Sequence, residues 1–141
     1  MAHAGPTFAS DLAREVQFVQ RLAPEVSIAL PRGKPNTGPA IRAVAAAMNL
    51  NPHKAHRLAT LLYRMFWQHG VDISTPSVIR NLADQADLPD LSITPEAVET
   101  VAVWHEGWLA RGVGSVPDLI RQDGESITGL VDLDALRQFV Q

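Results

Sequence analysis

The chain contains no cysteine among its 141 residues. This absence excludes disulfide bonds, thiolate metal ligands and a thiol nucleophile. No run of Lys or Arg is long enough to form a basic face, and the formal net charge is −3, so nucleic acid is not an expected partner. No apolar stretch approaches the ~20 residues that span a bilayer. The first residues lack a basic segment followed by an apolar one, so we expect no signal peptide, no membrane association and a cytoplasmic location.

The composition fits one globular domain that covers residues 1–141. Apolar residues make up 46% of the chain, which is typical of a protein that buries a single core. Internal repeats and low-complexity segments are not visible. His53 and His56 lie three positions apart on a predicted helix, but no carboxylate follows at i+4, so we expect no metal site.

Helix signals dominate the first two thirds of the chain. Ser10 is a good N-cap, and we expect a first helix to begin there and to end at Pro24. Apolar and polar or small residues then alternate over 25–30, which predicts a strand. Four further helix starts follow, each a capping residue with Pro close behind it. They stand at Asn36-Thr37 with Pro39, at Asn51-Pro52, at Thr75-Pro76 and at Thr94-Pro95.

The pattern changes after Gly112. Residues 116–121 read as a short strand and residues 125–128 as its return strand. Asp123-Gly124 between them predicts a two-residue hairpin turn in which both residues have positive φ. Residues 132–140 then show the spacing of a last helix. The predicted order is helix, strand, four helices, two strands and helix.

This order, together with three segments, resembles the DsbA-like thioredoxin-fold family, in the branch of the 2-hydroxychromene-2-carboxylate isomerases and kappa-class glutathione transferases. The segments are Pro35-Asn36-Thr37 before a helix, Leu62–Phe66 with the later Gly70-Val71-Asp72-Ile73, and Ala110–Pro117. The resemblance implies an α/β fold, a reduced thioredoxin-like core (helix, strand, then ββα) with an inserted four-helix subdomain. Residues 8–35 and 112–141 would form the thioredoxin-like part and 36–111 the insertion. In a rival alignment, residues 11–15 belong to a later helix of the family and the first βαβ unit is absent.

The resemblance also implies a chemistry. It points to a glutathione-dependent isomerase or transferase without dithiol redox activity. Ser10 would be the catalytic hydroxyl that donates to the glutathione thiolate, Asn36 would contact substrate or thiol, and Val116, before a cis Pro117, would offer its backbone to the cysteinyl part. Asp132 stands one position after the place where relatives hold the γ-glutamyl end. Glutathione is thus a possible cofactor.

Each of these residues also has an ordinary structural interpretation, and a different function remains open. Ser10 and Asn36 suit plain helix caps, and Trp108, one turn from Trp104, suits either helix packing or a groove between helices and sheet. The alternative function is a non-catalytic binding or assembly protein on a degenerate thioredoxin-like scaffold. If the first thioredoxin strand is missing, the Pro117 strand keeps an unpaired edge. We therefore expect a homodimer or a partner chain that donates a strand.

Overall fold

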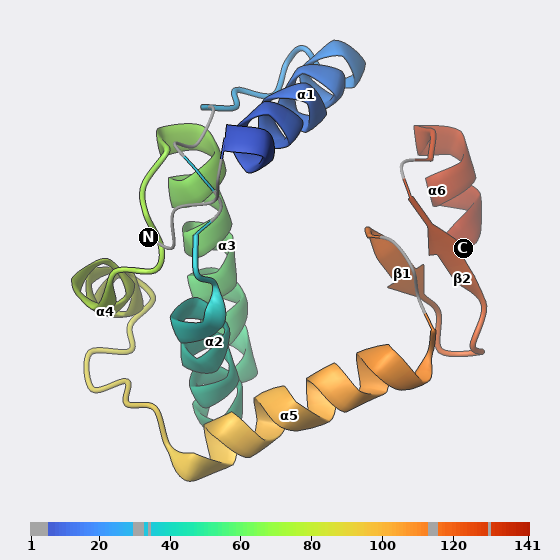
Figure 1. Cartoon of the computed structure of the whole chain (residues 1–141). Helices are drawn as coiled ribbons and strands as arrows, with labels where there is room; N and C mark the ends of the chain where they lie inside the picture. The colour runs from blue at the N-terminus through green and yellow to red at the C-terminus, as the bar shows by residue number, and fades with distance from the viewer. Residues whose placement is uncertain (1–5, 30–32, 34, 113–115, 130) are drawn as a thin grey trace. The chain divides into compact units, whose positions relative to one another are not determined.

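The computed structural model describes residues 6–29, 33, 35–112, 116–129 and 131–141. These residues form six helices and one small antiparallel sheet, so the molecule is mostly helical (Figure 1). The chain divides into two compact units, a first unit over 1–101 and a second unit over 102–141. The boundary lies inside a helix. The elements in chain order are α1 Pro6–Leu22, α2 Gly38–Leu50, α3 Pro52–His69, α4 Pro76–Gln85, α5 Pro95–Ala110, β1 Asp118–Ile120, β2 Ser126–Thr128 and α6 Leu133–Phe139.

The core of the first unit lies between α2, α3 and α4, which pack against one another. Small residues of α2 let α3 approach closely, and Leu58 of α3 is the largest side chain that is fully buried. The core-facing residues of α3 recur at helical spacing, and Ile79 and Leu82 of α4 close the same cluster. A second, smaller cluster is formed where Ala97, in the first turn of α5, packs against Ala45 and Ala46 of α2.

The four predicted helix starts within 36–111 are confirmed, and each helix has a proline in its first turn. Asn51 ends α2 and caps α3, since its side-chain oxygen accepts from Lys54 N–H at 3.2 Å. Gly70 ends α3 with φ of 64°, a left-handed conformation in which its N–H and that of Val71 return to the last carbonyls of the helix.

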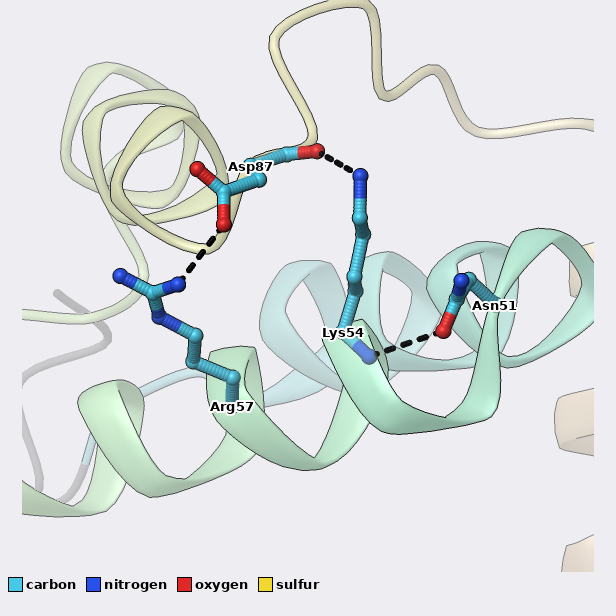
Figure 2. A network of polar contacts seen from close by, with 4 residues as sticks. All are labelled: Asn51, Lys54, Arg57 and Asp87. Carbon is cyan, nitrogen blue, oxygen red and sulfur yellow. Dashed lines mark hydrogen bonds and ion pairs between the residues drawn. The ribbon is translucent and has the colours of Figure 1, made fainter.

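Asp87 holds the end of α4 against the start of α3 (Figure 2). It has a positive φ of 61° just after the helix. Its backbone oxygen accepts from Lys54 Nζ at 2.8 Å, and its carboxylate lies 2.7 Å from Arg57 Nη1. Because both members of the ion pair are more than half exposed, its contribution to stability is small, of the order of 0.5 kcal/mol.

Two predictions for the N-terminal part are wrong. The helix begins at Pro6, so Ser10 lies inside α1 and is not its first residue. Proline is well suited to the first turn of a helix, which explains the earlier start. The described residues 25–29 of the predicted strand at 25–30 form a turn and a loop, whereas Leu30 lies outside the described residues. Ala29 N–H donates to the Trp67 carbonyl at the end of α3 at 2.7 Å, so helix α3 takes the backbone bond that a neighbouring strand would have taken.

The second unit consists of the rest of α5, the hairpin β1–β2 and α6. Leu119 stands opposite Ile127 in the ladder. The turn differs from the predicted one: three residues, 122–124, lie between Arg121 and Glu125, whose backbones are paired because Arg121 N–H donates to Glu125 O, and Gly124 N–H donates to Arg121 O within the turn. Only Gly124 has positive φ. The Asp123 carboxylate instead accepts from Arg121 Nε at 2.8 Å, and this bond lowers the pKa of Asp123 and raises that of Arg121.

Candidate binding surfaces

An open groove of about 550 Å³ lies in the first unit between α1, α3 and the loop at 26–28. Two hydrogen bonds hold its walls together. Gln20 Nε2 of α1 donates to Ile28 O at 3.2 Å, and Ala29 N–H donates to Trp67 O of α3. One face of helix α3 therefore packs in the core, and another face lines this groove.

The groove has an apolar floor and a polar rim. Val16 of α1 is buried, and Val19, Ile28 and Trp67 continue the apolar lining. The residues of α3 that line the groove recur at i, i+3, i+4, i+7 and i+8, but most of them are polar, so they form no apolar stripe in the sequence. The polar and charged lining residues are Glu15, Ser27, Thr60, Tyr63, Arg64 and Gln68. Such a surface suits contact with an apolar body, but it brings together none of the predicted site residues.

The predicted site residues of the first unit are Ser10 and Asn36. Ser10 lies in the second turn of α1, which begins at Pro6. Asn36 precedes α2, whose N-cap is Thr37. The Asn36 Oδ1 accepts a hydrogen bond from Gly38 N–H at 3.1 Å, so the Asn36 side chain binds a free backbone N–H at the start of α2.

The remaining predicted site residues lie in the second unit. The Val116–Pro117 peptide bond is cis, as the resemblance implies. The Pro117 carbonyl accepts from Gly129 N–H at 2.7 Å, and Val116 is exposed. Asp132 is the N-cap of α6, where its side chain accepts from Ala135 N–H at 2.8 Å. Trp108 is about one third exposed on α5.

The exposed apolar surface of the second unit is a feature that the sequence analysis missed. No residue of this unit that the structure describes is buried. On α5, Trp104 and Trp108 follow the stripe of Ala97 and Val101, yet Val103 and Leu109 are exposed by 58% and 62% on other sides of the same helix. The signal was available, because apolar residues recur all around this helix instead of along one stripe.

The described residues hold no metal centre and no membrane-spanning helix. Among the residues that the structure describes, no three His, Asp or Glu side chains gather as they would around a metal ion. In the same part of the chain, every helix is too short or too polar to cross a membrane. No family model matches the sequence, and no curated protein matches it either.

Proposed function

We propose that this chain is a non-catalytic binding or assembly protein that associates through the apolar surface of its second unit. The observation that carries the proposal is the exposure of the apolar side chains of α5 after Val101. A helix with apolar side chains on every side is normally found in an interior, whereas Val103, Trp104 and Leu109 are all exposed here. This apolar surface therefore fits contact with another polypeptide.

The rest of the second unit supports the same proposal. A two-stranded hairpin is marginally stable at best in water, and α6 spans only the seven residues Leu133–Phe139. Arg121 joins them, since its guanidinium lies 5.4 Å from the centre of the Phe139 ring and donates to the Phe139 carbonyl. Contacts of this kind at an exposed site stabilise only weakly. An added layer of apolar contacts is the missing source of stability.

The test is the mass of the purified full-length chain by light scattering over a wide range of concentrations. We expect a species heavier than one chain, and we expect Val103→Glu with Leu109→Glu to return it to one chain. Leu50→Glu is the matched control, because Leu50 is 66% exposed and belongs to the first unit. A wild-type chain that stays monomeric at hundreds of micromolar, with a double variant that behaves identically, contradicts the proposal.

A second candidate keeps the chemistry that the resemblance implies. In this proposal the hairpin and α6 are the ββα end of a thioredoxin-like core in a cytoplasmic glutathione-dependent isomerase or transferase. The observation in its favour is the order β1, β2, α6 directly after the helical block. Calorimetric titration with millimolar glutathione tests it. Binding that is weakened by Ser10→Ala supports this candidate, and the absence of heat in the wild type removes it.

A further inference from the structure

Strand β1 has one edge that no described strand covers. The sheet has two strands, so each strand has an outer side. Pro117 O and Arg121 N–H bond to β2, and Leu119 stands opposite Ile127 between them. Since hydrogen-bonded pairs alternate along an antiparallel ladder, Asp118 and Ile120 direct their N–H and C=O groups away from β2.

Several of the features that protect a sheet edge against strand pairing are absent from this outer edge. Edges are commonly blunted by short strands, by charged side chains and especially Lys, by a bulge or by Pro; β1 is short and carries Asp118, but it has no Lys. The second unit contains no Lys. Pro117 belongs to the inward-bonding set, because its carbonyl accepts from Gly129 N–H, so its missing N–H does not interrupt the outer edge. The outer edge therefore keeps two residues with all four backbone groups available.

The edge is self-complementary under a two-fold rotation. If the axis passes beside Leu119, Asp118 of one copy faces Ile120 of the other, and the reverse pair follows by symmetry. All four outward groups on each strand then find partners. Leu119 faces its own counterpart in a closely spaced pair without hydrogen bonds. Like charges directly opposite each other would destabilise such a pair, and this register places none there.

The outer edge of β2 is less suitable for the same contact. Its outward residues are Ser126 and Thr128, and the charged Glu125 precedes them. The Thr128 hydroxyl is already engaged, since it donates to Asp118 Oδ1 at 2.7 Å.

We infer that the associating partner is a second copy of this chain, and that two β1 strands pair antiparallel about Leu119 to form one four-stranded sheet. The inference rests on the proposed function and names its partner and register. The exposed apolar residues of α5 flank this contact in sequence and belong to the same unit.

The absence of native cysteine makes the test direct, because a single introduced thiol can pair only with its counterpart. In the full-length chain, Leu119→Cys places two thiols on residues whose Cα atoms are about 4.5 Å apart, within the range of a disulfide. Ile127→Cys is the matched control in the same sheet. Its counterpart lies three strand spacings away, about 14 Å, which is too far to bridge. Under mild oxidation we expect Leu119→Cys to form covalent dimers at least tenfold faster than Ile127→Cys.

Ile120→Pro gives a second measurement that does not depend on oxidation. It removes an outward N–H and leaves the inward ladder to β2 intact, so we expect the hairpin to persist and the mass to fall to one chain. Equal rates for both cysteine variants, or faster linking of Ile127→Cys, overturn the register. A dimer with no linking at Leu119→Cys overturns the inference and leaves the proposed function standing. A wild-type chain that is monomeric overturns both.

Discussion

Replacing Leu58 by alanine measures how much the core of the first unit contributes to its stability. Leu58 is completely buried between α2, α3 and α4. The change removes three carbon groups, which at about 0.8 kcal/mol each is a loss of roughly 2.4 kcal/mol from burial alone. The cavity that remains adds to this loss, so we expect the free energy of unfolding to fall by about 3 to 5 kcal/mol.

The assay is chemical denaturation followed by far-ultraviolet circular dichroism. The midpoint should fall with an unchanged slope, because the surface exposed on unfolding stays the same. Leu50→Ala is the matched control: Leu50 is largely exposed on the neighbouring helix, so its change should stay within about 0.5 kcal/mol. If Leu58→Ala cost no more than Leu50→Ala, the packing of α3 described above would be wrong.

Three further substitutions test local features by the same denaturation assay. Asn51→Ala removes the cap bond to α3 and should cost about 1 kcal/mol, whereas Thr75→Ala should be nearly neutral because the Thr75 side chain makes no cap bond; equal losses would contradict the capping role. The hydrogen bonds from the Ser74 hydroxyl and N–H lower the pKa of Asp72, so its ionised form stabilises the fold above its unfolded pKa and this stability is lost as the pH falls through the folded pKa. Asp72→Asn should therefore be less stable than wild type at pH 7 and should approach it as the pH falls through the lowered pKa of Asp72; a difference that does not change with pH would refute this origin. Asp87→Gly should cost less than Asp87→Ala, because only glycine adopts the positive φ without strain while both lose the ion pair to α3; the reverse order would show that the backbone conformation there is not restrictive.

The sequence predicted the parts of the fold that depend on local chemistry. The start of α3 follows from the Asn51 cap and Pro52, and the start of α4 follows from Pro76 in its first turn, since a cap or a proline acts within one turn. The hairpin and the last helix followed from a change of period after Gly112.

The parts that depend on distant partners were not predictable in the same way. The alternation of apolar and polar or small residues at 25–29 is compatible with a strand, but a strand also needs a neighbouring strand to pair with. Here the Ala29 N–H donates to the Trp67 carbonyl of α3 instead. Ser10 suits a cap, but an earlier residue, Pro6, begins the helix. The hairpin turn is longer than predicted, and within it only Gly124 has positive φ while the Asp123 carboxylate bonds to Arg121. The groove likewise depends on how α1 and the loop meet α3.

Hydrogen exchange of the four outward-facing hairpin amides tests the central claim most directly. In the paired sheet the N–H groups of Asp118 and Ile120 are bonded across the two-fold axis, whereas those of Ser126 and Thr128 face solvent and serve as internal controls. We expect exchange at Asp118 and Ile120 to slow as the protein concentration rises, while exchange at Ser126 and Thr128 stays fast. Equally fast exchange at all four positions, at every concentration, would show that β1 pairs with no second copy.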